Sequence, residues 1–202
     1  NRNTGYNPMT IEGKKTVSFE IFQQLKRVPD HLFVSVGDGV IISGIYKGFR
    51  DLFKLGRINK IPIIHGIQAS GSSAVFRALE CGDFEIMPAK TVADSISVDM
   101  PSNGILAKKN LENFGGQCIL ATDEEILFAQ KELSSKCGLF SEPASAAAYA
   151  GLLKQKKFID SNEICVVLLT GNGLKDINSA HKKIRIPKNT INSLKDLDFI
   201  RK

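Results

Sequence analysis

The sequence predicts an α/β fold in which a mostly parallel, twisted sheet is flanked by helices. Short apolar runs alternate with longer stretches of helical spacing, as consecutive parallel βαβ units require. Two of the apolar runs end directly in glycine-rich turns. The 202 residues are 43% hydrophobic and 24% charged, which is ordinary globular usage and sufficient for a sizeable core.

The first elements follow one another along the chain at short spacings. Apolar residues recur at helical spacing over residues 15–25. Residues 32–36 form an apolar run that is typical of a buried strand and stops at a Gly-Asp-Gly turn. Helical spacing returns over residues 42–55, and Gly56 ends it. The pattern is therefore helix, strand, turn and helix.

The remaining elements repeat this pattern. We expect a second strand over residues 62–67 and a short helix over 72–81. A helix over residues 122–136 begins at a threonine that can cap it and continues with three acidic residues that suit its positive end. An alanine-rich helix over 144–153 and a strand over 164–169 complete the prediction.

Two glycine-rich turns are the candidate ligand-binding elements, because ligands of open α/β sheets bind beyond the carboxyl ends of the strands. The first turn, Gly37-Asp38-Gly39, leads through Val40 and Ile41 into the next helix. Free N–H groups and the positive end of the helix dipole suit a phosphate there. The turn matches neither the GxGxxG fingerprint nor the P-loop, and an ordinary tight turn is the alternative.

The second turn spans residues 170–173 and begins with Thr170, at the end of the last predicted strand. Its hydroxyl can donate to a ring nitrogen or to another acceptor of a ligand. Capping of the turn is the alternative role. Because both turns follow strands of a parallel sheet, we expect them to face one crevice.

The charge distribution argues against nucleic acid as a partner. The chain has 27 basic and 21 acidic residues, and from residue 175 to residue 202 eight basic residues oppose three acidic ones. The body is therefore close to neutral, and the tail has a single aromatic residue, Phe199, and no recognisable nucleic-acid motif. We expect one main unit at 1–178 and a solvated basic tail at 179–202.

Several features favour a cytoplasmic protein. No apolar stretch is long enough to cross a membrane, and no secretory leader is visible, so we expect no membrane association. The cysteines form no CxxC pair and have no histidine at metal-ligand spacing, which predicts reduced thiols and no metal site. The three histidines are scattered and are interpreted as ordinary surface or core residues. The four cysteines are Cys81, Cys118, Cys137 and Cys165.

Five segments carry a family resemblance. They read NP…EGKKT at residues 7–16, VGDG…SGIYKGF at 36–49, TVADSI at 91–96, EPASAA at 142–147 and TGNGLKD at 170–176. In this order, the set resembles threonine synthase and its close relatives among the fold-type II pyridoxal-phosphate enzymes. The resemblance covers roughly residues 3–178. It implies the large domain of that fold, which is similar to the β subunit of tryptophan synthase.

The resemblance implies a cofactor, pyridoxal 5'-phosphate, and a role for each turn. In the family, the loop matching residues 37–41 holds the cofactor phosphate through backbone N–H groups, and the threonine matching Thr170 meets the pyridine nitrogen. The implied substrate is a small amino-acid phosphate, O-phosphohomoserine, which reacts with water to give threonine and phosphate. Family members are often dimers, so a homodimer is implied by analogy.

The sequence also departs from the family pattern. Ahead of the Glu-Gly-x-Lys-Thr motif the family tends to read Asn-Ser-x-Asn-Pro-x-Arg, whose Asn, Ser and Arg clasp the substrate phosphate. Thr4, Gly5 and Thr10 stand at those positions. A threonine cannot replace the two-pronged contact of an arginine. Val40 and Ile41 also stand where the family loop has Gly and Asn. The exact substrate therefore stays open.

The family's Schiff-base lysine lies in a Ser-x-Lys-type motif, and no such motif precedes Asn7. Lys14, Lys15 and Lys47 lie in other segments, and we interpret Lys14 and Lys15 as exposed residues at a helix start. Because the chain also begins with Asn rather than Met, we expect the C-terminal portion of a carbon–oxygen lyase, without a catalytic residue and inactive alone. The alternatives are another fold-type II enzyme for a different amino acid and a lysine-less binding module.

Overall fold

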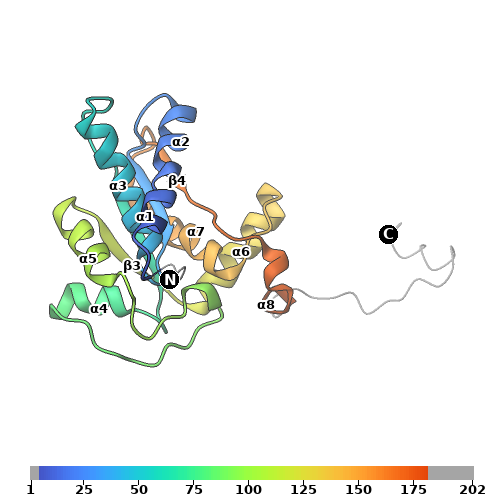
Figure 1. Cartoon of the computed structure of the whole chain (residues 1–202). Helices are drawn as coiled ribbons and strands as arrows, with labels where there is room; N and C mark the ends of the chain where they lie inside the picture. The colour runs from blue at the N-terminus through green and yellow to red at the C-terminus, as the bar shows by residue number, and fades with distance from the viewer. Residues whose placement is uncertain (1–4, 182–202) are drawn as a thin grey trace, which may run out of the picture.

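The computed structural model describes residues 5–181 (Figure 1). At its centre is a four-stranded sheet in the order β3-β2-β1-β4, and every neighbouring pair is parallel. The α/β class with a parallel sheet is therefore confirmed. The strands are β1 (His31–Ser35), β2 (Ile63–Ala69), β3 (Gln117–Ala121) and β4 (Cys165–Val167).

Helices cover both faces of the sheet (Figure 1). One face packs against α2, α3, α4 and α5, and the other packs against α6 and α7. In the described residues the helices are α1 (Met9–Lys14), α2 (Thr16–Leu25), α3 (Val40–Lys54), α4 (Ala74–Cys81), α5 (Gly104–Asn113), α6 (Asp123–Cys137), α7 (Pro143–Gln155) and α8 (Ile177–His181). Three 3₁₀ turns are η1 (Asp94–Ile96), η2 (Lys156–Phe158) and η3 (Gly173–Lys175).

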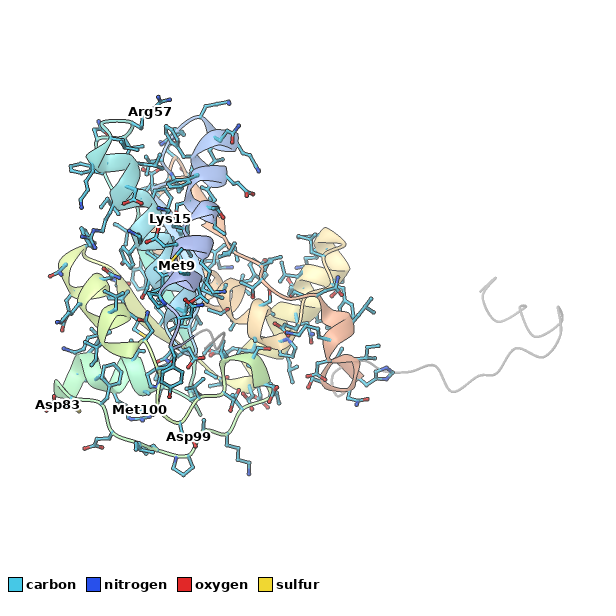
Figure 2. All side chains as sticks on the ribbon, viewed as in Figure 1. Met9, Lys15, Arg57, Asp83, Asp99 and Met100 are labelled. Carbon is cyan, nitrogen blue, oxygen red and sulfur yellow. The ribbon has the colours of Figure 1, made fainter. Side chains whose placement is uncertain are left out.

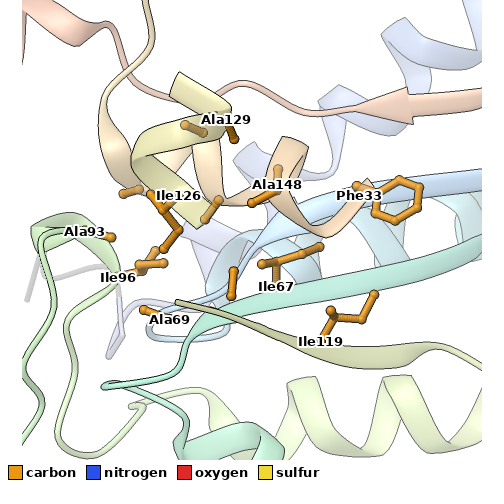
Figure 3. Packing of buried hydrophobic residues seen from close by; sticks show 14 of the residues in the cluster. Phe33, Ile67, Ala69, Ala93, Ile96, Ile119, Ile126, Ala129 and Ala148 are labelled. Atoms are coloured by element: carbon orange, nitrogen blue, oxygen red, sulfur yellow. The ribbon is translucent and has the colours of Figure 1, made fainter. Parts of the chain in front are cut away.

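Small residues let α7 lie close to the sheet. Phe33 of β1 and Ile67 of β2 are fully buried beneath α7, with Ala148 of that helix above them (Figure 3). A Cβ at Gly151 would overlap the side chain of Ile67. This close approach brings the amino end of α7 to the carboxyl ends of the central strands.

A second close contact holds the N-terminal helices on α3. A Cβ at Gly44 would lie 2.7 Å from the Cβ of Lys14, and one at Gly48 would overlap the carbonyl oxygen of Lys15. The two glycines are about one turn apart on the same face of α3. They therefore let the backbone of α1 approach α3 where larger residues would keep it away.

The sequence patterns missed α1, α5 and β3. The six residues of α1 are too few for a helical period to show, and β3 is an edge strand with a short apolar run. The expectation that Lys14 and Lys15 are exposed residues at a helix start holds only for the position of Lys15, which is the residue before α2, and is wrong for the exposure of both. Lys14 is the last residue of α1 and Lys15 lies between α1 and α2, and both are partly buried.

The remaining predicted elements are present with shifted ends. The predicted strand at 164–169 shortens to the three residues of β4, while α3 begins two residues earlier than predicted. Thr122 caps α6 through a reciprocal pair of hydrogen bonds with Glu125.

The four cysteines are free thiols. The predicted boundary at 178/179 falls within α8, and the tail beyond His181, like Thr4, lies outside the described residues.

At the amino end of the sheet, two histidines that are far apart in sequence lie on neighbouring strands. His31 Nδ1 is 2.9 Å from His65 Nε2, and both residues are buried. The ring of His65 also stacks on Phe33, with the ring centroids 4.4 Å apart.

The part of the chain that the structure describes contains no helix with both the length and the apolar character needed to cross a bilayer.

Candidate functional site

The order of the strands reverses at β1. From β1 the chain moves outward to β2 and β3, and then returns to β4 on the other side of β1. In such sheets, ligands bind at this switch point, beyond the carboxyl ends of the strands. The turn at 37–41 follows β1 and Thr170 follows β4, and both line one cavity of about 580 Å³. The structure thus brings the two predicted turns together in one crevice.

The first turn presents the amino end of α3 to this cavity. Gly39 is the residue before the helix, and its φ of 82° lies in the left-handed region that favours glycine. It has no side chain with which to cap the helix. None of the described residues accepts a hydrogen bond from the amides of Val40, Ile41 and Ile42. These N–H groups and the helix dipole make this end of the cavity suitable for an anion.

Both glycines of the turn are required by the neighbouring backbone. A Cβ at Gly37 would lie 2.9 Å from the Cα of Ile96. One at Gly39 would lie 2.9 Å from the Cβ of Ala107 and 2.9 Å from the carbonyl oxygen of Asn103. Contacts this short do not occur at real Cβ atoms without movement of the neighbour. The turn therefore packs closely against η1 and α5 while its amides face the cavity.

The residues before α5 fix the shape of the turn. Ser102 Oγ donates to Asp38 Oδ1 at 3.0 Å, which engages the carboxylate. Asn103 Nδ2 donates to the carbonyl oxygen of Gly39 at 3.1 Å and to Ser43 Oγ at 2.7 Å. The sequence patterns did not identify Ser102 or Asn103, because they lie 64 residues beyond the turn and adjoin a helix that the patterns missed.

The second turn is held through its backbone. The amide of Thr170 donates to Ser145 Oγ at 2.9 Å, and the carbonyl oxygen of Gly171 accepts from the amide of Glu142 at 3.0 Å. The Thr170 side chain is exposed, and its hydroxyl forms no hydrogen bond with the described residues. The alternative in which this hydroxyl caps the turn therefore does not hold, and the hydroxyl is available to a ligand.

A buried carboxylate and a lysine form another part of the cavity lining. Glu142 is 6% exposed, and its Oε2 lies 2.9 Å from Lys175 Nζ and accepts from Ser95 Oγ at 3.1 Å. A Cβ at Gly171 would overlap the Glu142 carboxylate. Because the charges of Glu142 and Lys175 cancel, this part of the cavity adds little net charge.

Nowhere in residues 5–181 do three metal-ligating side chains gather into a possible metal site.

Two other cavity residues lack partners among the described residues. Ser35, the last residue of β1, is 4% exposed, and its Oγ has no hydrogen-bond partner there. A buried hydroxyl in this state costs about 1–3 kcal/mol unless something binds it. Lys14 also lines the cavity without an ion pair, whereas the adjacent Lys15 pairs with Glu12 at 2.8 Å and with Asp51 at 3.0 Å.

Comparison with known proteins identifies relatives of this chain. A family model described as "Pyridoxal-phosphate dependent enzyme" matches residues 1–171. The threonine synthase of Methanocaldococcus jannaschii is 42% identical over 180 residues, which are 86% of this chain and 44% of that protein. The threonine synthase of Bacillus sp. (strain ULM1) is 37% identical over 196 residues, 94% of this chain and 54% of that protein. The chain thus spans about half the length of these relatives.

Solved structures agree in fold at lower identity. A fungal L-serine ammonia-lyase from Rhizomucor miehei matches with a TM-score of 0.74 and 21% identity, over 88% of this chain and 57% of that one. The processed form of threonine deaminase isoform 2 from Solanum lycopersicum matches with a TM-score of 0.70 and 22% identity, over 85% and 48%. At these identities the likeness is one of fold.

Proposed function

The chain belongs to the pyridoxal-phosphate dependent enzyme family, and from this premise we propose that it is the portion of a threonine synthase that binds the cofactor phosphate. The intact enzyme converts O-phosphohomoserine and water into threonine and phosphate. One observation supports this most directly: the open amides at the start of α3 and the free hydroxyl of Thr170 line the same cavity. The likeness to threonine synthases supports the choice of reaction.

The residues of the cavity fit pyridoxal phosphate. The amides of residues 40–42 have no partner among the described residues and can take a phosphate dianion. Ser35 lines the same cavity, and its buried Oγ, which has no partner among the described residues, is a further donor that we assign to the cofactor. The volume of about 580 Å³ is that of an ordinary small-molecule site. When bound, the cofactor supplies an electron sink for carbanions of the amino-acid substrate.

Each of these groups has a separate task. The α3 amides hold the phosphate, and Asn103 and Ser102 keep the loop in the shape that presents them. Thr170 would donate its hydroxyl to the ring nitrogen of the bound cofactor. Because this hydroxyl is neutral, whereas a carboxylate would carry charge, Thr170 would hold the ring nitrogen without favouring its protonation, and this would moderate the electron withdrawal that the cofactor supplies for chemistry at the β and γ carbons.

We assign no covalent role to a lysine of this chain. Lys14 and Lys175 both line the cavity, but neither belongs to a Ser-x-Lys-type motif. Lys175 is engaged by Glu142 at 2.9 Å. The proposal therefore gives this chain the binding of cofactor and substrate, and it predicts that the 202-residue chain alone forms no threonine.

The test uses the full-length product of the gene. Cofactor binding is followed by absorbance, and phosphate and threonine are measured after addition of O-phosphohomoserine. Thr170→Ser retains the hydroxyl and is expected to keep the wild-type cofactor spectrum. Thr170→Val removes one neutral hydrogen bond, so the affinity for the cofactor falls about three- to tenfold and the spectrum shifts.

Three outcomes count against the proposal. A wild-type protein that fails to bind pyridoxal phosphate contradicts it entirely. A protein that binds the cofactor but acts only on another amino acid supports the alternative of a different fold-type II enzyme. A protein that binds the cofactor and turns over no amino acid supports the alternative of a non-catalytic binding module.

A further inference from the structure

Lys14 ends helix α1 and lines the cavity together with Val40 and Ile41 of the phosphate-binding turn. Its position follows from the close contact between α1 and α3, since its Cβ would lie only 2.7 Å from a Cβ at Gly44. Figure 2 labels Met9 and Lys15, which bracket this short helix. Lys14 is therefore held at the cavity by the packing of its own backbone.

Lys14 lines the cavity with its ammonium group unpaired by any of the described residues. Four charged side chains contribute to the lining: Lys14, Asp38, Glu142 and Lys175. The carboxylate of Asp38 accepts from Ser102, and Glu142 pairs with Lys175. Within the described part of the chain, Lys14 has neither an ion pair nor a hydrogen bond through its ammonium group. The hydrogen bond from the neutral Ser102 leaves the charge of Asp38 in place, so the four lining charges sum to zero. The groups that an anion can bind on this side are the unpaired ammonium of Lys14 and the amino end of α3.

The direction of the side chain follows from helix geometry. Gly44 faces Ile11 and Lys14, and Gly48 faces Lys15, so α1 and α3 run in the same direction. Long side chains on a helix point back toward its amino end. The ammonium of Lys14 is therefore directed over the preceding turn, where Thr10 stands on the same face, and toward the amino end of α3.

We propose that Lys14 binds the phosphate group of the amino-acid substrate, at a second anion site beside the one at the start of α3. This inference rests on the proposed function. The amides of residues 40–42 already provide for one phosphate, and Gly44, against which Lys14 packs, lies about one turn, or 5.4 Å, further along the helix. The cation that the sequence lacks at Thr10 is thus supplied one turn later on α1.

The consequence is selectivity for a phosphorylated amino acid over its free hydroxyl counterpart. A lysine is a flexible point charge with three donors, which suits a phosphate dianion. Charge-assisted hydrogen bonds of this kind are stronger than neutral ones, and loss of one lowers affinity about ten- to hundredfold. A neutral hydroxyl offers Lys14 no comparable interaction, so unphosphorylated homoserine gains little from it.

The experiment compares three variants of the full-length, cofactor-loaded protein with the wild type. Lys14→Gln removes the charge and keeps the length, and Lys14→Arg restores a cation. Lys54→Gln is the matched control, because Lys54 is exposed at the far end of α3 and does not line the cavity. Calorimetry measures the binding of O-phosphoserine as an unreactive probe, absorbance measures cofactor affinity, and KM and kcat are measured with O-phosphohomoserine.

For Lys14→Gln we expect the Kd for O-phosphoserine and the KM for O-phosphohomoserine to rise about ten- to hundredfold, with a much smaller change in kcat. Cofactor affinity stays near the wild-type value, Lys14→Arg recovers most of the probe affinity, and Lys54→Gln changes nothing. Loss of cofactor affinity with unchanged probe binding overturns the inference, because Lys14 then serves the cofactor phosphate. Unchanged probe binding and KM also overturn it. A wild-type protein without cofactor binding overturns the proposed function and the inference with it.

Discussion

The side-chain amide of Asn103 donates to Ser43 Oγ at 2.7 Å and so ties the amino end of α5 to the first turn of α3. The same amide donates to the carbonyl oxygen of Gly39 at 3.1 Å, and Ser43 Oγ donates to that carbonyl at 2.7 Å. These three bonds hold the amino ends of two helices together. The row of open amides at the start of α3 is therefore fixed before a ligand arrives, which reduces the entropic cost of binding.

Replacement of Asn103 by alanine should loosen the turn. The variant loses two partly buried hydrogen bonds, so we expect the free energy of unfolding to fall by about 1–3 kcal/mol and cofactor affinity to fall about tenfold. Chemical denaturation and cofactor titration measure the two effects. Asn113→Ala is the control, because Asn113 ends the same helix and is exposed. Equal effects of the two substitutions would contradict the role assigned to Asn103.

Gly39→Ala should be more damaging than the same change at Gly56. Both residues have a positive φ, 82° and 65° respectively, but a Cβ at Gly56 meets nothing within 4 Å. Gly56→Ala therefore costs only the backbone strain of about 1–2 kcal/mol. Gly39→Ala adds a clash with Asn103 and Ala107, for a total of about 2–4 kcal/mol. Thermal unfolding of the two variants gives the difference, and similar losses would show that the turn tolerates a side chain.

Ser35→Ala should separate stability from binding. Its hydroxyl has no partner among the described residues, so its removal leaves the stability of the cofactor-free protein unchanged or raises it by up to about 1 kcal/mol. Cofactor affinity falls about three- to tenfold, because the ligand loses a donor. Ser43→Ala, which removes a hydroxyl that is already bonded, should lower stability. A stability loss in Ser35→Ala with unchanged cofactor affinity would show that the hydroxyl has a structural partner.

Acid should destabilise the protein through His65. Burial, with a smaller effect of the adjacent His31, lowers the pKa of His65 to about 4 from its ordinary value of 6.5. Between these two pH values the unfolded chain binds a proton that the folded protein does not. The contribution to stability is therefore complete above pH 6.5 and falls by about 3 kcal/mol as the pH approaches 4.

The pH effect is measured as the urea midpoint from pH 7 to pH 4. His65→Gln has no titrating ring and should show a shallower decline over this range. His181→Gln is the control, since the side chain of His181 is exposed. An unchanged slope in His65→Gln would mean that other groups produce the acid sensitivity.

The amino-acid sequence by itself determines the fold class and the position of both turns. The apolar runs of β1 and β2, the helical period of α3 and the capping threonine with its acidic neighbours at the start of α6 are all local properties of the chain. The Gly-Asp-Gly turn and Thr170 follow apolar runs directly, so their place at strand ends can be read from the chain. The parallel arrangement then predicts that they share one crevice, as they do.

Only the tertiary structure decided which distant residues complete the cavity. Asn103 reaches the turn because α5 packs beside α3, and Lys175 reaches Glu142 because η3 lies against the amino end of α7. Lys14 reaches the cavity because Gly44 permits a close helix contact. No local period encodes such contacts, since each depends on how two separately formed elements pack. For that reason the sequence alone assigned Lys14 to an exposed helix start, whereas the fold places it beside the open amides of α3.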